Sequence, residues 1–229
     1  MLELRIAGRD FAQPVLGGIA TMVDPGDRIC LLGPSGIGKT TLLNAIAGLD
    51  SKVPASAIIG REEIGVGYLF QEHRLLPWRS LRANIQLVGA SAPEADEYLA
   101  GVGLAGYGHY LPDQLSLGMA RRAALARCLA IKPDLLLLDE PFASLDPVMA
   151  DELKQLIVVI LDANPSMAMI CVTHDGGDVA TLANRLWYLD GKPAQLLWDG
   201  AIEEAGLIDS LLEKLRNSER TGQRQKFGY

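Results

Sequence analysis

The stretch that decides the fold of this chain lies near its N-terminus and reads Gly33-Pro34-Ser35-Gly36-Ile37-Gly38-Lys39-Thr40. It matches the pattern G-x-x-x-x-G-K-T and follows an apolar run at 29–32, which places it between a buried strand and a helix. Glycines let successive backbone N–H groups curl around a phosphate chain, and the following helix adds the positive end of its dipole. Lys39 can then reach the β- and γ-phosphates, and the hydroxyl of Thr40 can bind Mg²⁺. A glycine-rich turn that binds nothing is the alternative, but the strand-loop-helix context favours a nucleoside triphosphate site.

A second informative stretch is Leu135-Leu136-Leu137-Leu138-Asp139-Glu140, four apolar residues followed by two acids. A buried strand of a parallel sheet presents its C-terminal end to the crevice that also receives the phosphate loop. Asp139 is then placed to reach Mg²⁺, and Glu140 to polarise the water that attacks the γ-phosphate. A strand that simply ends in acidic turn residues is the alternative, and the phosphate loop in the same chain disfavours it.

The rest of the chain alternates short apolar runs with amphipathic stretches. The alternation at 2–6 is typical of an edge strand. Further strands are predicted at 28–32, 66–70, 135–138, 167–172, 186–189 and 195–198, the last two as a hairpin around Gly191. Helices are predicted at 40–47, 117–131 (with Arg121, Arg122 and Arg127 on its polar positions), 147–163, 179–183 and 202–216, together with a helical insertion at 77–110 that contains 81–88 and 94–102. This alternation predicts an α/β fold with a mostly parallel sheet covered on both faces.

The composition describes a globular chain with an excess of negative charge. Its 229 residues are 49% hydrophobic and carry a formal net charge of −7, so one large domain is expected and a nucleic-acid partner is disfavoured. The one basic cluster, at 214–226, is interpreted as a solvated tail, with a membrane-surface or partner contact as the alternative. Three cysteines far apart in apolar surroundings favour free thiols in a reducing compartment. Neither a secretory leader nor a membrane-spanning run is expected.

Six motifs in a fixed order give the chain a specific resemblance. They are the phosphate loop at 33–40, Gln71, Leu115-Ser116-Leu117-Gly118, the run at 135–140, Ser144-Leu145-Asp146, and His174. This order resembles that of the ATP-binding cassette (ABC) ATPases over nearly the whole chain. The resemblance implies a phosphate-loop ATPase core with a mostly parallel sheet, an N-terminal antiparallel β subdomain and a small inserted helical subdomain. It divides one ABC ATPase domain, 1–229, into a core at 1–76 and 133–200, a helical subdomain at 77–132, and a C-terminal helix and tail at 201–229.

The resemblance also assigns roles to single residues, in a reaction that uses ATP and Mg²⁺. The catalytic residues would be Glu140, His174, Gln71 and Lys39. The metal ligands would be Thr40, Gln71 and Asp139. The residues expected to bind ATP are Phe11, Gly33, Pro34, Ser35, Gly36, Ile37, Gly38, Lys39, Thr40, Thr41, Ser116, Gly118 and Asp146.

Several of these roles compete with ordinary structural ones. Phe11 would stack on adenine, but a core phenylalanine of the first sheet is the alternative. Asp146 would lie in the loop that crosses to the partner subunit, and it can also cap the helix that follows Pro147. Gln71 and His174 each follow a predicted strand, where a purely structural polar residue is the alternative.

The segment 115–118 resembles the family's signature motif, in which Ser116 and Gly118 would bind the γ-phosphate of ATP held by a second subunit. A helix begins there, and free N–H groups at a helix start capture anions. The resemblance therefore implies a homodimer, or a pseudo-symmetric pair, with two ATP molecules at the interface. Leu117 departs from the family pattern, which has glycine at this position. Either the backbone of Leu117 is ordinary, or the γ-phosphate contact is weakened.

The segment 70–79 is similar to that of the ATPases of nitrate, sulfonate, taurine and pyrimidine-precursor importers. In that family it lies beside a groove for a short helix of the membrane subunit, and 75–78 offers an apolar surface of this kind. Packing of these residues inside the helical insertion is the alternative. The resemblance implies integral membrane permease subunits as partners, a periplasmic solute-binding protein as an indirect one, and a peripheral location on the cytoplasmic face of the cell membrane.

Three functions are compatible with the sequence. The resemblance favours an ATPase subunit that energises a membrane importer of a small solute, whose identity the sequence does not contain. A soluble cassette ATPase in assembly or nucleic-acid work is the second, although long coiled-coil insertions and basic faces are missing. A nucleotide-binding switch with little catalysis is the third, and Leu117 is the reason to keep it.

Overall fold

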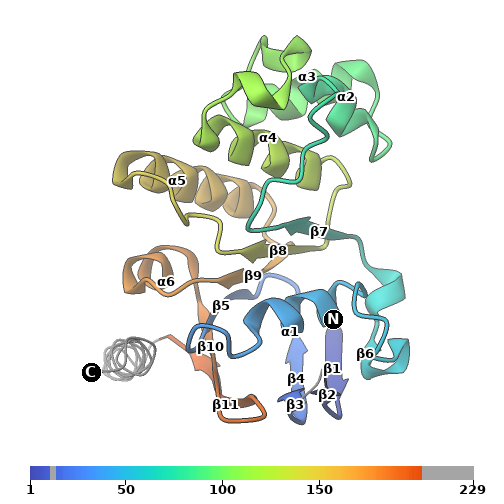
Figure 1. Cartoon of the computed structure of the whole chain (residues 1–229), viewed down its shortest axis with the longest axis vertical. Helices are drawn as coiled ribbons and strands as arrows, with labels where there is room; N and C mark the ends of the chain where they lie inside the picture. The colour runs from blue at the N-terminus through green and yellow to red at the C-terminus, as the bar shows by residue number, and fades with distance from the viewer. Residues whose placement is uncertain (11–13, 203–229) are drawn as a thin grey trace, which may run out of the picture. The chain divides into compact units, whose positions relative to one another are not determined.

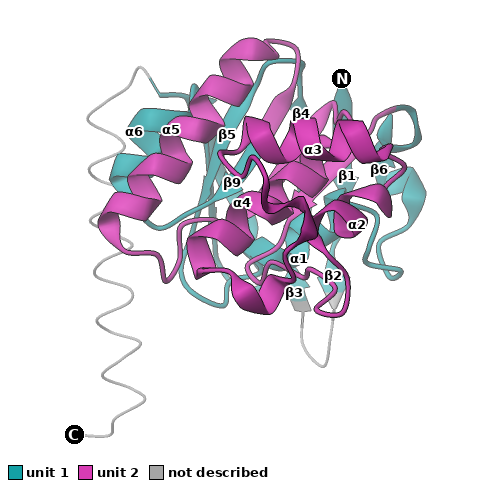
Figure 2. Cartoon of the chain, turned by 90° about the horizontal axis from the view of Figure 1, so that it is seen from above, with its two compact units in different colours: residues 1–63, 170–229 teal, residues 64–169 magenta. Residues whose placement is uncertain are grey.

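The computed structural model describes residues 1–10 and 14–202 and divides the chain into two compact units (Figure 2). Unit 1 contains residues 1–63 and 170–229, and unit 2 contains residues 64–169. The strand β9 (Ala168–Val172) carries the chain from unit 2 back into unit 1. Figure 1 labels the helices and strands of both units. The division of the domain predicted from the sequence has other bounds and stays a prediction.

Unit 1 contains a three-stranded antiparallel sheet in the order β4-β1-β6. The strands are β1 (Leu2–Ile6), β4 (Ile19–Val23) and β6 (Ile58–Ile59), and Leu2 lies opposite Val23. The prediction of an edge strand at 2–6 was wrong, because β1 pairs on both sides. The alternation of apolar and polar residues shows that one face of a strand packs against a core. It does not show how many strands pair with it in the sheet.

Unit 1 also holds the parallel strand pair that leads into the phosphate loop. The strands β5 (Arg28–Leu32) and β10 (Arg185–Asp190) run parallel, and β10 forms an antiparallel hairpin with β11 (Gln195–Ala201). The loop after β5 ends in α1 (Lys39–Ile46), and Gly48 follows that helix with φ +73°. The remaining elements of unit 1 are α6 (Gly176–Leu182), the short strands β2 (Arg9–Asp10) and β3 (Pro14–Leu16), and the 3₁₀ turns η1 (Ala55–Ala57) and η2 (Arg61–Glu63).

Unit 2 combines two parallel strands with four helices. The strands are β7 (Val66–Leu69) and β8 (Leu135–Asp139), with Val66 opposite Leu135. The helices are α2 (Leu81–Gln86), α3 (Ala92–Gly101), α4 (Leu117–Leu129) and α5 (Pro147–Ala163), with the 3₁₀ turns η3 (Tyr107–His109) and η4 (Pro112–Gln114) before α4. All five residues of β8 are buried, as expected for a strand that reads as a continuous apolar run.

Local chemistry explains where the helices of unit 2 begin. Ser80, Ser91 and Ser116 cap α2, α3 and α4, and Ser91 forms a capping box with Glu94. Strands β5, β8 and β9, the hairpin of β10 and β11, and the helices α1 to α6 lie within a few residues of their predicted bounds. The predicted α/β fold with parallel strands is therefore confirmed, whereas β2, β3, β4 and β6 were not predicted. The predicted helix at 202–216 extends beyond the described residues, and Phe11 lies outside them.

Candidate functional site

The phosphate loop wraps around the side chain of its own lysine. Lys39 Nζ donates to the carbonyl oxygens of Gly33 at 2.7 Å and Pro34 at 3.0 Å, and only 8% of the residue is exposed. The loop therefore holds an ammonium group among main-chain atoms, where nearby water screens its charge little. Thr40 and Thr41 follow Lys39 in the first turn of α1, and Thr40 is exposed.

The start of α1 is suited to a bound anion. Gly38 occupies the cap position with φ +117°, and it has no side chain with which to satisfy the first N–H groups of the helix. A Cβ on Gly38 would lie 3.0 Å from side-chain atoms of both Leu16 and Val15, so a larger residue would have to displace them, and the φ of +117° strains any residue with a side chain. The lysine and this helix start together fit a triphosphate.

Gln71 and Glu140 lie together in unit 2. Gln71 Nε2 donates to Glu140 Oε2 at 3.3 Å, although 69 residues separate them in the chain. Glu140 follows directly after β8 and has φ +47°, a left-handed conformation that is rare for a residue with a side chain. Two residues that were both predicted to be catalytic are thus within hydrogen-bonding distance of each other.

Asp139 ends β8 and is 3% exposed. Its carboxylate and the amide oxygen of Gln71 are the hard oxygen ligands that Mg²⁺ prefers. Within residues 1–10 and 14–202, no three His, Cys, Asp or Glu side chains are grouped so that they could hold a metal by themselves. The donor set fits a cation that keeps water and phosphate oxygens among its ligands, which is how Mg²⁺ is usually bound.

A stack of side chains lies beside Asp139. The rings of Tyr68 and Phe70 are 3.9 Å apart and nearly parallel, and the guanidinium of Arg74 lies 3.8 Å from the Phe70 ring centre. Burial raises the pKa of Tyr68, and the charge of Asp139 raises it further. The phenol therefore stays protonated next to the carboxylate, and the stack links the end of β7 to the segment after Gln71.

Arg121 is the residue of unit 2 that sequence reasoning misplaced. It was predicted on the polar face of its helix, but it is 3% exposed. Its guanidinium donates to the carbonyl oxygens of Glu140 (3.0 Å), Pro141 (2.7 Å) and Ala143 (2.9 Å). A buried arginine that finds backbone acceptors is consistent with the cost of burying a charge. No sequence signal could have revealed it, because carbonyl acceptors belong to every residue type.

Ser116 and Gly118 lie at the start of α4. Ser116 accepts a hydrogen bond from the Met119 N–H at 3.3 Å, which makes it the helix cap. Leu117 is the first helical residue and is 43% exposed. It is not among the described residues with positive φ, so its backbone is ordinary and the first of the two readings of Leu117 holds. A Cβ on Gly118 would lie 3.1 Å from Met149 Sδ, so Gly118 also lets α5 approach closely.

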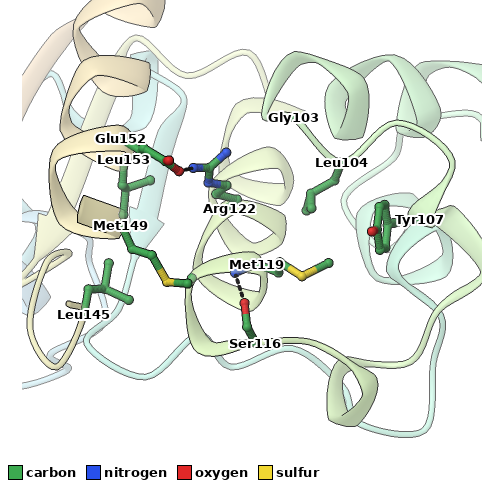
Figure 3. Close-up of a pocket in the computed structure, with 11 residues that line it drawn as sticks. Gly103, Leu104, Tyr107, Ser116, Met119, Arg122, Leu145, Met149, Glu152 and Leu153 are labelled. Carbon is green, nitrogen blue, oxygen red and sulfur yellow. Dashed lines mark hydrogen bonds and ion pairs between the residues drawn. The ribbon is translucent and has the colours of Figure 1, made fainter. Parts of the chain in front are cut away.

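A pocket of about 300 Å³ lies next to this helix start (Figure 3). The side chains of Ser116, Met119 and Met149 line it, and an ion pair between Arg122 and Glu152 forms part of its wall. Residues at the starts of both α4 and α5 line the pocket, and two of the six motifs, at 115–118 and 144–146, lie at these helix starts.

Asp146 and His174 lie at element ends in the two different units. In unit 2, Asp146 accepts from the N–H groups of Val148 and Met149, both at 3.1 Å, so its predicted capping role is confirmed. In unit 1, His174 is exposed and follows β9. The turn around it is held by Thr173, whose hydroxyl donates to Asp178 at 2.5 Å and accepts from the Asp175 N–H at 3.1 Å.

The segment after Gln71 divides into a buried and an exposed part. Leu75 is buried, whereas Trp78 is 72% exposed. Asn84, which is fully buried, accepts from the Leu76 N–H at 2.7 Å and donates to the carbonyls of Leu76, Arg79 and Ser80. Packing inside the helical part therefore holds for Leu75, whereas Pro77 and Trp78 are exposed and form the apolar surface of this segment. No sequence signal marks Asn84 as the residue that organises this segment.

The comparisons with known proteins agree with this set of motifs. A family model described as ABC transporter matches residues 16–143, more than half of the chain. The chain belongs to the ABC transporter family. Its predicted membership and its predicted class of reaction, ATP hydrolysis, are thereby confirmed.

Curated members of the family are close in sequence. The aliphatic sulfonates import ATP-binding protein SsuB 2 of Burkholderia cenocepacia (strain HI2424) is 40% identical over 206 residues, which are 86% of this chain and 76% of that protein. SsuB 1 of Pseudomonas aeruginosa (strain UCBPP-PA14) is 40% identical over 210 residues, 86% of this chain and 83% of that protein. The taurine import ATP-binding protein TauB of Yersinia pestis bv. Antiqua (strain Antiqua) is 38% identical over 200 residues, 81% of this chain and 77% of that protein.

Solved structures of ABC cassettes share the fold. A dimeric post-hydrolysis structure of the ATP-binding cassette MJ0796 bound to ADP and Pi has a TM-score of 0.74, and a second dimeric structure of MJ0796 has 0.75. Each is 24% identical and covers 89% of this ABC cassette and 99% of the solved chain. Among residues 1–10 and 14–202 of this cassette, no helix is both long and apolar enough to cross a bilayer.

Proposed function

We propose that this chain is the ATP-hydrolysing subunit that energises a membrane importer of a small solute. The observation that carries the proposal is the complete, ordered set of ATPase motifs in a member of the ABC transporter family. Relatives at about two-fifths identity are import ATP-binding proteins for aliphatic sulfonates and taurine, which supports an importer of a small organic anion. The reaction is ATP plus water to ADP plus phosphate.

The roles proposed for the residues follow from their chemistry. Lys39 and the loop N–H groups stabilise negative charge on the γ-phosphoryl group as it leaves ADP. Glu140 accepts a proton from the attacking water, while the water oxygen bonds to phosphorus and the bond to the bridging oxygen breaks. Gln71 holds the carboxylate of Glu140 through the 3.3 Å hydrogen bond and orients the water. His174 contacts the γ-phosphate, and Phe11 stacks on adenine.

Mg²⁺, held by Thr40, Gln71 and Asp139, would neutralise charge on the phosphate oxygens when it is bound. The remaining residues of the loop, from Gly33 to Thr41, contribute N–H groups and hydroxyls to the same triphosphate, except Pro34, which has no N–H group and contributes to the shape of the loop. The exposed position of Thr40 and the buried carboxylate of Asp139 support these assignments.

A second copy of the chain is part of the proposal. Ser116, Gly118 and Asp146 lie in the first turns of α4 and α5 or cap them, and we assign them to the ATP of the facing copy. Two ATP molecules at the interface then close the pair, and hydrolysis with phosphate release reopens it. The ordinary helical backbone of Leu117 supports a working signature motif over a switch with little catalysis.

The membrane partners belong to the same proposal. The closing pair would pull on helices of integral permease subunits that dock near Trp78, and a periplasmic binding protein would deliver the solute to them. The chain would then be bound peripherally to the cytoplasmic face of the cell membrane.

The test compares two protein variants, each of which lacks one group that acts on the phosphates. Glu140→Gln should keep ATP binding and lower turnover by about three orders of magnitude, because only the proton acceptor is lost. Lys39→Ala should weaken Mg-ATP binding itself, since an ammonium group that pairs with phosphate disappears. Binding is measured by calorimetry and turnover by phosphate release. Wild-type turnover in Glu140→Gln, or unchanged affinity in Lys39→Ala, would contradict these two assignments.

The pairing and the permease each have their own readout. Glu140→Gln with Mg-ATP should elute as a dimer from a sizing column, and wild-type protein with ADP as a monomer. A trapped variant that stays monomeric, alone and together with a permease, would remove the second copy from the scheme. Co-purification with an integral membrane subunit separates the importer from a soluble cassette ATPase.

A further inference from the structure

Three carbonyl groups of the turn after β8 converge on one buried cation. The acceptors of Arg121 are Glu140 O, Pro141 O and Ala143 O, all between 2.7 and 3.0 Å from its terminal nitrogens. Glu140 O also closes the turn, because it accepts from the Ala143 N–H at 3.1 Å. The segment is called the 140–144 turn from here on.

This turn needs an external support. Glu140 has φ +47° and Ser144 has φ +62°, so both of its ends are left-handed although neither is glycine. Such conformations cost free energy and persist only where surrounding contacts determine them. A planar guanidinium with several N–H donors can hold several carbonyls in fixed directions, which an ammonium group cannot do equally well.

The support comes from the helix of the signature segment. Arg121 lies five residues after Ser116, about 7.5 Å further along the axis of α4. The neighbouring Arg122 points to Glu152 of α5 instead, and Arg127 donates to the carbonyls of His73 and Arg74. Only Arg121, among the arginines of α4, contacts the backbone of Glu140. Burial lowers the pKa of Arg121 and the charge of Glu140 opposes this, so the two groups also feel each other electrostatically.

We propose that Arg121 is a positioning residue for ATP hydrolysis: it fixes the backbone of the general base Glu140 and ties it to the helix that begins at Ser116. The proposal rests on the function proposed above. It adds a mechanical link between two sites of one chain: the binding of a γ-phosphate at the start of α4 would change the position of the base Glu140. When α4 moves, the three hydrogen bonds move the 140–144 turn, and the carboxylate of Glu140 moves with it.

The test uses the full-length chain, with Mg-ATP turnover measured over a range of ATP concentrations. Arg121→Gln should lower kcat by about 100-fold with KM for ATP nearly unchanged, because a displacement of about 1 Å in a reacting group costs that much while ground-state binding is retained. Arg121→Lys should recover part of the rate, since it keeps the charge and loses the planar fork. A purely structural role would lower the folded fraction, which by itself lowers the apparent kcat at unchanged KM. The kcat is therefore calculated per folded molecule, counted by stoichiometric Mg-ATP binding, and a purely structural role would then leave it at the wild-type value.

Arg122→Gln is the matched control. It removes the same charge one position along α4, and its partner is Glu152 instead of the 140–144 turn. We expect its kcat to stay within about threefold of the wild type, in line with the small worth of an exposed ion pair. Equal losses in Arg121→Gln and Arg122→Gln would overturn the proposal, and so would a wild-type kcat in Arg121→Gln or a loss that lies in KM.

Two further measurements keep the outcome decisive. If Arg121→Gln melts below the assay temperature, Arg121→Lys decides, and a wild-type kcat there overturns the proposal. In the Glu140→Gln background, Arg121→Gln should leave ATP-dependent dimer formation intact, because the proposal concerns the base and not the binding of nucleotide. Loss of the dimer would contradict it. A wild-type chain that hydrolyses no ATP at all, by contrast, would refute the proposed function itself.

Discussion

His73 lies in the segment that follows Gln71, and its surroundings favour the neutral imidazole. Its Nδ1 accepts a hydrogen bond from the Leu75 N–H at 3.2 Å, which requires an unprotonated nitrogen. Burial lowers its pKa, and the charges of Arg121 and Arg127 lower it further, while Glu72 opposes them. Protonation would place a third positive charge near two arginines of α4.

This residue predicts a dependence of stability on pH. The folded-state pKa of His73 lies below the unfolded value near 6.5, so between the two values the unfolded chain binds more protons. Its contribution to the free energy of unfolding is therefore complete above about pH 6.5 and is lost as the pH falls toward the folded pKa. Urea unfolding at pH 7.5 and pH 5.5 measures the effect. His73→Gln should show a smaller drop than the wild type, and an equal or larger drop would contradict the assignment.

At the scale of elements, α4 connects three segments of unit 2 through three arginines. Arg121 holds the 140–144 turn, Arg122 pairs with Glu152 of α5, and Arg127 donates to the carbonyls of His73 (3.2 Å) and Arg74 (2.8 Å). Residues on a helix are spaced by about 100°, so positions 121, 122 and 127 reach different neighbours. Through these contacts α4 holds the three segments in fixed positions relative to one another.

The short helix α2 depends in the same way on one buried amide. Asn84→Ala should lower the free energy of unfolding by about 2 to 3 kcal/mol, because it leaves the Leu76 N–H and three carbonyls without their side-chain partner. Chemical denaturation measures the loss. Gln86→Ala, an exposed amide on the same helix, should change stability by less than about 0.5 kcal/mol. Equal effects of the two substitutions would show that Asn84 is not the organising residue.

At the scale of the whole molecule, Trp78 is the test of the proposed assembly. A tryptophan that is 72% exposed costs solubility unless a partner covers it, and such side chains are often central to interfaces. Trp78→Ala should reduce co-purification with permease subunits by at least about tenfold, the loss expected when an interface anchor worth about 1.4 kcal/mol or more is removed. Its melting temperature should stay that of the wild type.

The control is Val159→Ala on α5, which removes another exposed apolar side chain (63% exposed) from the same unit. It should leave co-purification unchanged. Equal recovery of the permease with both variants would place the docking surface elsewhere.

The residues that carry chemistry were visible in the sequence because each stands at a fixed place relative to a strand or a helix. The phosphate loop follows β5, Asp139 ends β8 with Glu140 next to it, and Ser116 caps α4. Turn glycines, helix caps and apolar runs are local properties, so the order of the motifs determined the family and most element positions.

Tertiary structure alone decided which residues support that chemistry. Arg121 and Asn84 are polar residues in helices, and only packing shows that both are buried and bound to backbone carbonyls. The neighbours of β1 and the separation of buried Leu75 from exposed Trp78 were decided in the same way. The physical reason is that a carbonyl group is common to all residues, and contacts with it across tens of positions leave no pattern in the side-chain sequence.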